Sequence, residues 1–220
     1  MQCSTCRLEA VIFQPYSGRH LCRSHFILDL EAKAKRAIRV HHGMQPGDHI
    51  AVAVNGDSAG NALLFFLRKL TGNRKDIRIS AIMVGEGQEN TDFIPDADTT
   101  KIAIAATLEN AAASVLTMIL RGDVEKCFGP GPATAGGIPR ITPFIHIPAE
   151  EIAVYAHLCG VGGEVRIASK EPFPLFSDVM AILADYSSRH PATPHAVLNL
   201  CEALGQAGGS HDDSTIRHGT

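Results

Sequence analysis

Four potential metal ligands stand at the start of the chain in two closely spaced pairs. Cys3 and Cys6 form the first pair, and Cys22 and His25 form the second, with a spacer of 15 residues between the pairs. Thiolate and imidazole are ligands that tetrahedral zinc prefers, and four protein ligands leave no open coordination position. The spacer contains adjacent turn-forming residues, which favour a fold-back of the second pair onto the first. The spacing therefore predicts a structural zinc knuckle over residues 1–26, with ordinary buried thiols as the alternative.

A second candidate site is the loop at residues 55–60, Asn-Gly-Asp-Ser-Ala-Gly, which follows an apolar run at residues 49–56. A helical pattern over residues 61–70 comes next. A glycine-containing loop between a strand and the first turn of a helix can bind an anion with its backbone amides. The alternative is a plain connection in which Asp57 or Ser58 caps the helix, because neither common phosphate-binding glycine motif is present.

Cys127 is a third candidate, since a thiol at the start of a Gly/Pro-rich connection could be reactive. No neighbouring group in the sequence activates it, and this favours the role of a bystander. We keep Cys127 as the one weak candidate for a catalytic residue.

Alternating strands and helices must position these residues. Apolar runs predict strands, and periodic segments between them predict helices, at residues 49–56, 61–70, 77–84, 101–106 and 108–120. This order is typical of an α/β fold with a Rossmann-like, doubly wound parallel sheet. Ligands of such sheets bind beyond the carboxyl ends of the strands, where the loop 55–60 and the turn 107–110 are expected to meet.

A basic helix is predicted over residues 26–42. Its apolar positions, Phe26, Leu30, Ala34, Ala37 and Ile38, fall on one stripe, so they should face the core. The cationic residues lie largely off this stripe and could contact a phosphate backbone: Lys33, Lys35, Arg36 and Arg39. A solvated helix face is the alternative.

Composition limits the function classes. The chain has 220 residues and a net charge of −3, so an RNA contact would have to come from a local basic patch. It has no apolar run long enough for a membrane span and no signal-peptide pattern, and its clustered cysteines suit a reducing cytoplasm. We expect an α/β domain at residues 27–160 after the knuckle, a C-terminal helical segment at 161–205 and a disordered tail at 206–220.

On these residues the chain resembles the tRNA 2-thiolation enzymes of the N-type ATP pyrophosphatase (PP-loop) superfamily. It is most similar to the subgroup that thiolates uridine and carries an N-terminal zinc knuckle. The likeness rests on the knuckle and on segments at both ends of the chain: Leu21-Cys22-Arg23, Pro46-Gly47-Asp48, Ile138-Pro-Arg-Ile-Thr-Pro-Phe144 and His190-Pro-Ala-Thr193. It implies an adenine nucleotide alpha hydrolase-like fold, a structural zinc ion, and ATP and tRNA as ligands. It also implies nucleotide binding by the loop residues Asn55, Gly56, Asp57, Ser58 and Gly60.

The chain departs from the family where the chemistry would occur. The family loop is Ser-Gly-Gly-x-Asp-Ser, and only Gly56 keeps its register in an ungapped comparison. Asp57 would direct a carboxylate toward the phosphates of ATP. The second nucleotide signature corresponds to residues 105–111, which have lost most of its polar groups, and the segment that carries the catalytic Cys-x-x-Cys is shortened.

Three functions follow from this comparison. The first is a degenerate paralogue that binds tRNA, or pairs with a thiolase or sulfur carrier, without full catalysis. The second is an active ATP-dependent tRNA sulfurtransferase with an atypical loop, in which Cys127 carries sulfur. The third is a regulatory module in which Asp57, Glu86 and Glu109 bind a cation or sugar hydroxyls. We expect the first, in the cytoplasm, with a homodimer left open.

Overall fold

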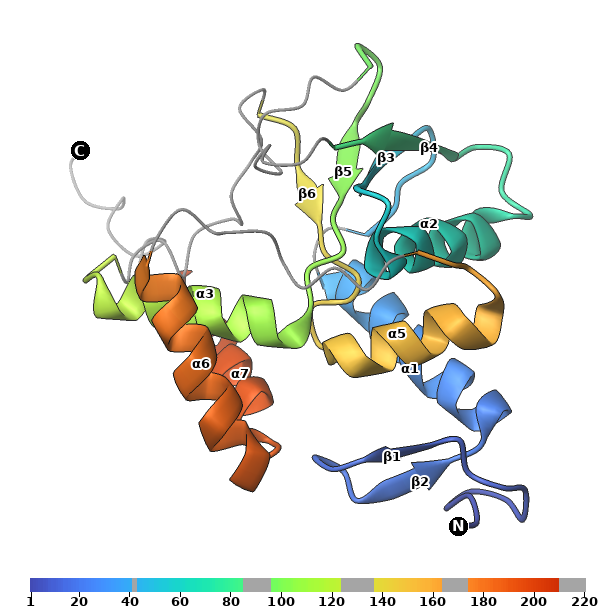
Figure 1. Cartoon of the computed structure of the whole chain (residues 1–220). Helices are drawn as coiled ribbons and strands as arrows, with labels where there is room; N and C mark the ends of the chain where they lie inside the picture. The colour runs from blue at the N-terminus through green and yellow to red at the C-terminus, as the bar shows by residue number, and fades with distance from the viewer. Residues whose placement is uncertain (41–42, 85–95, 124–136, 164–173, 210–220) are drawn as a thin grey trace, which may run out of the picture.

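The computed structural model describes residues 1–40, 43–84, 96–123, 137–163 and 174–209, the last five of these as backbone only (Figure 1). Cys127, Glu86 and the tail beyond residue 209 lie outside this part of the chain. None of the described helices is long and apolar enough to cross a bilayer.

A small antiparallel hairpin opens the chain. Its strands are β1 (Ile12–Gln14) and β2 (Arg19–Leu21), paired so that Phe13 lies opposite His20. The turn between them closes when the Gly18 N–H donates to the Gln14 carbonyl at 2.8 Å, and Gly18 takes a left-handed φ of 65° that glycine adopts without strain. The predicted fold-back is therefore present.

Helix α1 (Arg23–Val40) follows the hairpin directly and begins three residues before its predicted start. All five residues of the predicted apolar stripe are buried, as its spacing indicated. The same helix buries Glu31, whose carboxylate accepts hydrogen bonds from Lys69 Nζ at 2.6 Å and Tyr155 Oη at 3.1 Å. These donors give the carboxylate partners inside the core, which a buried charge requires.

Four parallel strands form the sheet in the order β4-β3-β5-β6. Their bounds are Arg78–Met83 for β4, His49–Val54 for β3, Lys101–Ala103 for β5 and Arg140–Ile141 for β6. Every residue of β3 is buried, as expected for an inner strand of a parallel sheet. Strand β6 pairs at only two residues, because the prolines at 139 and 143 on either side of it cannot donate to a strand ladder. The α/β prediction with a parallel sheet and flanking helices is confirmed.

A buried ion pair anchors the amino ends of β3 and β5. Lys101 Nζ lies 2.5 Å from Asp48 Oδ2, and both side chains are about nine-tenths buried. The Asp48 carboxylate also accepts the Gln45 N–H at 2.7 Å and the Thr100 hydroxyl at 2.9 Å. Burial raises the pKa of Asp48, but Lys101 and the two hydrogen bonds outweigh it and hold that pKa below its usual value.

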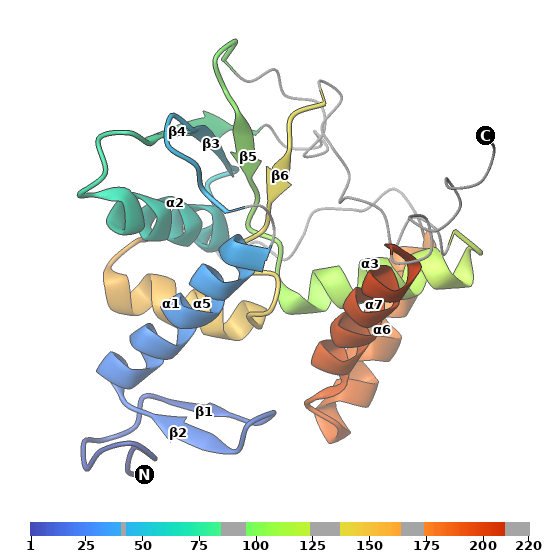
Figure 2. The same cartoon turned by 180° about the vertical axis from the view of Figure 1, so that it is seen from behind.

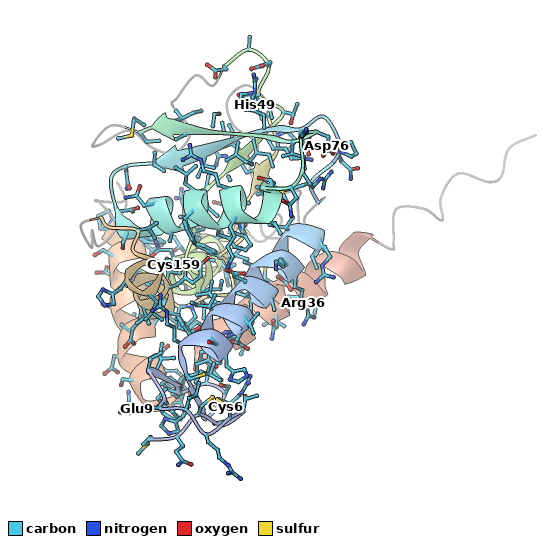
Figure 3. All side chains as sticks on the ribbon, turned by 90° about the vertical axis from the view of Figure 1, so that its right-hand side faces the viewer. Cys6, Glu9, Arg36, His49, Asp76 and Cys159 are labelled. Atoms are coloured by element: carbon cyan, nitrogen blue, oxygen red, sulfur yellow. The ribbon has the colours of Figure 1, made fainter. Side chains whose placement is uncertain are left out.

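The sheet lies at one end of the molecule and the hairpin at the other, with helices α2, α5 and α1 between them (Figure 3). Helix α2 (Ser58–Thr71) packs against β3 and β4, and α5 (Ala149–Cys159) packs on α2 together with α1. One apolar cluster runs through all these layers and includes Cys3, Cys22 and Leu21 of the hairpin. The hairpin is therefore joined to the α/β body by a shared core.

A second apolar cluster lies between α3 (Leu108–Leu120), α6 (Pro174–Arg189) and α7 (Thr193–Gly209). In Figure 2 these three helices stand together, apart from α1 and α5. The sequence assigned α3 to the domain at 27–160, whereas its apolar face packs with the C-terminal helices. Helix α7 also continues to Gly209, so the first residues assigned to the tail are helical. The domain division stays a prediction.

Candidate functional site

The four ligand atoms of the knuckle converge at one end of the molecule. Those of Cys3, Cys6, Cys22 and His25 all lie within 4.8 Å of one another. His25 Nδ1 is 3.5 Å from Cys3 Sγ and 3.3 Å from Cys22 Sγ, and the sulfurs of Cys6 and Cys22 are 3.7 Å apart. Ligand bonds of tetrahedral zinc imply about 3.8 Å between two sulfurs and about 3.5 Å between sulfur and nitrogen. The four side chains therefore fit one tetrahedral ion.

The surroundings shift the pKa values of two thiols of this cluster in opposite directions. Burial raises the pKa of Cys3, but backbone N–H groups of the neighbouring knuckle residues and the His25 side chain outweigh it and bring that pKa to about 5. The N–H of Leu8 lowers the pKa of Cys6, yet burial and the two adjacent cysteines raise it above its usual value. Metal ligation requires thiolates, and a divalent cation would relieve the repulsion between them.

A buried polar network holds the hairpin against the body. Glu151 of α5 accepts the Tyr16 hydroxyl at 2.6 Å and the Gln14 side-chain amide at 3.1 Å. Lys33 of α1 lies 3.7 Å from the same carboxylate and 2.7 Å from Asp29. Burial raises the pKa of Glu151 despite these donors. No local sequence pattern indicates this network, because it joins residues more than 130 positions apart.

The predicted anion loop leaves the carboxyl end of β3 and leads into α2. Asp57 is the N-cap residue: its Oδ1 accepts the Gly60 N–H at 2.7 Å. The Asn55 side chain accepts the Asp57 N–H at 3.1 Å, and Gly56 has a φ of 82°. The alternative of a capped βα turn is therefore the geometry that the structure adopts, with the carboxylate where an anion would approach.

Close packing explains one loop glycine, Gly60, and also Gly163, which lies next to the loop in space. A Cβ on Gly60 would lie 3.2 Å from Val54 Cα and 3.3 Å from the Ala53 carbonyl oxygen, so the helix start is pressed against the strand. From the other side, Gly163 covers the Asp57–Ser58 peptide, and a Cβ there would lie only 2.7 Å from Ser58 N. The glycines after α5 are visible in the sequence, but their position over the loop could not be predicted from it.

The turn after β5 leaves the same edge of the sheet, as predicted, and is also capped. Thr107 Oγ1 accepts the Asn110 N–H at 3.4 Å, and Glu109 accepts the N–H of Ala149, the first residue of α5, at 3.0 Å. Asp57 and Glu109 thus both accept backbone N–H groups at helix starts. Among the residues described, neither belongs to a group of three or more potential metal ligands.

The predicted basic face is divided by the structure. Lys33 points inward to the Tyr16 and Asp29 side chains, and Lys35 lies 4.0 Å from Glu31. Arg36 and Arg39 are exposed on the outer side of α1, where Figure 3 labels Arg36. These two arginines are the cations of the four that can most readily meet a phosphate backbone.

A cluster around His49 was missed from the sequence. His49 Nε2 lies 2.7 Å from Ser80 Oγ, and its Nδ1 lies 3.0 Å from Asp98 and 2.7 Å from Arg78. Arg78 also pairs with Asp98. Burial and Arg78 lower the pKa of His49, so the imidazole is neutral near pH 7 and locks the loop before β5 to the sheet.

Comparisons with known proteins agree with this geometry. Residues 2–27 match the family model described as the 2-thiouridine synthetase TtuA N-terminal LIM domain. The tRNA 2-thiolation protein NcsA of Haloferax volcanii is 21% identical over 281 aligned positions, which cover 94% of this chain and 87% of that protein. The chain is related to the tRNA 2-thiolation proteins of the PP-loop superfamily.

Two further similarities were found, one in sequence and one in fold. The tRNA-5-methyluridine(54) 2-sulfurtransferase of Thermus thermophilus is 34% identical over 70 residues, 32% of this chain and 22% of that enzyme. The U34-tRNA thiolase NcsA of Methanococcus maripaludis, solved with its 4Fe–4S cluster, has a similar fold. Its TM-score is 0.76 at 16% identity, over 94% of this chain and 87% of that one.

Outside the knuckle, the part of the chain that the structure describes contains two cysteines, Cys159 and Cys201. The alignment with the Haloferax protein is longer than the 220 residues of this chain, so that protein contains insertions that this chain lacks. Cys159 ends α5 and packs on the main core, far from Cys6 in Figure 3, while Cys201 of α7 packs on the second one. Within the described residues, neither joins a group of three or more ligands. The described cysteines outside the knuckle therefore do not fit such a cluster.

Proposed function

We propose that this protein is a paralogue of the tRNA 2-thiolation enzymes that binds tRNA or a protein partner and lacks full ATP-dependent catalysis. The observation that carries the proposal is the Asp57 carboxylate, which accepts the Gly60 N–H at the start of α2. The family implies that the phosphates of ATP would bind at this loop. Here the capping carboxylate already accepts the Gly60 N–H, and it places a negative charge beside the other backbone amides of the loop.

The charge alone is a sizeable obstacle. A phosphate oxygen about 4 Å from a carboxylate is repelled by about 1 kcal/mol in bulk water and by about 4 kcal/mol at an effective dielectric constant of 20. Asp57 is half-buried, so the effective value lies between these limits. Each factor of ten in affinity corresponds to about 1.4 kcal/mol, so the carboxylate weakens pyrophosphate binding several-fold to several-hundred-fold.

An active ATP-dependent tRNA sulfurtransferase with an atypical loop is the second candidate. It is favoured by the strand, loop and helix order, which survives with a left-handed Gly56 and an exposed Asn55. In that case a divalent cation would join Asp57 to the nucleotide phosphates, and the carboxylate would become a ligand of the complex.

Calorimetry and a thiolation assay separate the two candidates. We expect no measurable heat when ATP with Mg²⁺ is titrated into the purified protein at micromolar concentration. We also expect no thiolated base when the protein is incubated with ATP, a sulfide donor and tRNA, under conditions in which a full-length NcsA serves as the positive control. Micromolar ATP binding together with turnover comparable to the control would establish the second candidate.

We propose that the ion of the knuckle is zinc and that it is structural. The proposal is supported by the donor set of three sulfurs and one imidazole nitrogen, by their mutual distances, and by the absence of an open position in a four-ligand site. Elemental analysis of the purified protein should give one zinc per chain. One iron or no metal in freshly purified protein would contradict the proposal.

The proposed partner surface is the outer side of α1 together with the hairpin. Arg36 and Arg39 are exposed there. The polyanion that would bind them is tRNA, which the related enzymes modify. A sulfur carrier, an intact thiolase or a second copy of the chain are alternative partners. Because three reduced cysteines are needed for the knuckle, we place the protein in the cytoplasm.

A further inference from the structure

Four residues after α5 form a short segment that returns to the start of α2; we call residues 160–163 the glycine strap. Gly160 ends α5 in a left-handed conformation with a φ of 69°, and its N–H donates to the His157 carbonyl at 3.1 Å. The Val161 N–H donates to the Ala156 carbonyl at 3.0 Å. This helix ending turns the chain back across α2 (Figure 1).

Two contacts bind the strap to the predicted anion loop. The Asn61 side-chain amide of α2 donates to the Gly162 carbonyl at 2.7 Å. Gly163 lies directly on the peptide between Asp57 and Ser58, where an added Cβ would be 2.7 Å from both Asp57 C and Ser58 N. A residue with a side chain could not occupy this position without moving the strap or the loop.

We infer that the glycine strap is an autoinhibitory contact that holds the loop at the start of α2 closed. In the closed state the peptide before the Ser58 amide is covered by Gly163, and the Gly60 amide is used by Asp57. An anion that binds the Ser58 amide would therefore have to displace the strap. The inference rests on the proposed function, because it assigns a regulator to the same loop.

The strap is built so that it can lift at low cost. Gly162 and Gly163 are exposed, and Val161 is only half-buried. The strap also borders an open groove of about 470 Å³ on the outer side of α2, lined by Asn61, Leu64, Phe65, Arg68, Lys69, Val161 and Gly162. Movement of the strap would break the bond to Asn61, and of the strap residues only the half-buried Val161 packs against the apolar core.

The test uses Asn61→Ala, which removes the anchor of the strap and leaves a good helix former in α2. Arg68→Ala is the matched control, because Arg68 lines the same groove on the same helix and, within the described residues, forms no hydrogen bond to the strap. Amide hydrogen exchange is measured at Ser58 and Ala59, and binding of inorganic pyrophosphate is measured by calorimetry. Gly163→Val provides a second variant that displaces the strap sterically.

We expect exchange at Ser58 and Ala59 to increase on the order of five-fold in Asn61→Ala, the effect of one lost hydrogen bond, and pyrophosphate binding to strengthen by a similar factor. The control should show neither change. Unchanged amide exchange at Ser58 and Ala59 in Asn61→Ala, with a native circular dichroism spectrum, would refute the inference that the strap holds the loop closed. Tight pyrophosphate binding by the unaltered protein would instead contradict the proposed function, so the two failures are distinguishable.

Discussion

Replacing Asp57 by asparagine separates the two roles of this side chain, the helix cap and the negative charge. Asparagine caps helices about as well as aspartate, so the Gly60 N–H keeps its acceptor and the free energy of unfolding should change by only a few tenths of a kcal/mol. Asp57→Ala removes the cap as well and should cost about 1 kcal/mol. For a chain of this size that corresponds to a fall in Tm of about 2–4 °C.

Both variants should strengthen anion binding despite their different stability, and Asp57→Ala should strengthen it more because it also frees the Gly60 N–H. Each removes one negative charge about 4 Å from an anion at the helix start, which is worth about 1–4 kcal/mol, or roughly 5-fold to 1,000-fold in Kd. Closure of the strap affects the unaltered protein and the variants alike. The ratio of Kd values between Asp57→Asn and the unaltered protein therefore reports the effect of the charge. Calorimetry with magnesium-free pyrophosphate is the suitable assay, because no cation can then bridge the carboxylate to the phosphates.

Weaker binding in Asp57→Asn would refute this reasoning. It would mean that the carboxylate does not repel the anion. In a parallel titration with Mg²⁺, weaker binding in Asp57→Asn would mean that the carboxylate contributes through a bridging cation, as the atypical active site requires. A large loss of stability in Asp57→Asn with no change in Asp57→Ala would show that the cap is not what holds the loop.

Three further predictions concern the rest of the molecule. Cys6→Ser should abolish stoichiometric zinc in elemental analysis and lower Tm, because the hairpin shares the main core, whereas Cys159→Ser should keep the zinc. The double variant Arg36→Glu, Arg39→Glu should weaken tRNA binding in a filter assay and reduce the slope of log K against log salt by about one for each lost contact; an unchanged slope would exclude this face. Lys101→Met leaves a buried carboxylate unpaired and should cost about 3–5 kcal/mol at neutral pH in urea denaturation. Since Lys101 lowers the pKa of that carboxyl, the unaltered protein holds this stability above pH 4 and loses it on acidification, so the deficit of the variant should shrink as the pH falls.

The elements that follow from local pattern were predictable from the sequence. The apolar stripe of α1 and the apolar run of β3 are each continuous in sequence, and burial follows both patterns. The knuckle ligands were predictable because metal-ligand spacing is a local property of the chain. The capped form of the loop was predicted only as an alternative. An aspartate before a helix looks the same in sequence whether its side chain caps the helix or belongs to a ligand-binding loop.

The features that sequence reasoning missed depend on contacts between distant segments. Gly163 lies on the Asp57–Ser58 peptide, 106 and 105 positions away in sequence, and no local pattern encodes that contact. Lys33 illustrates the reverse error. It lies on a basic helix, but the buried Glu151 draws it inward, so a cation that the helical pattern placed at the surface belongs to the core network.

The partition of charge along the chain favours the proposed binding role over catalysis. Residues 1–40 carry seven lysines and arginines against three acidic residues, whereas residues 41–220 carry 13 against 20. A zinc ion with three thiolates adds only one negative charge to the first group. We therefore expect a polyanion such as tRNA to be attracted to the hairpin and α1 and repelled by the rest, including the loop where Asp57 caps α2. This field would orient tRNA on the N-terminal region during encounter, and it requires an intact knuckle but no open nucleotide loop.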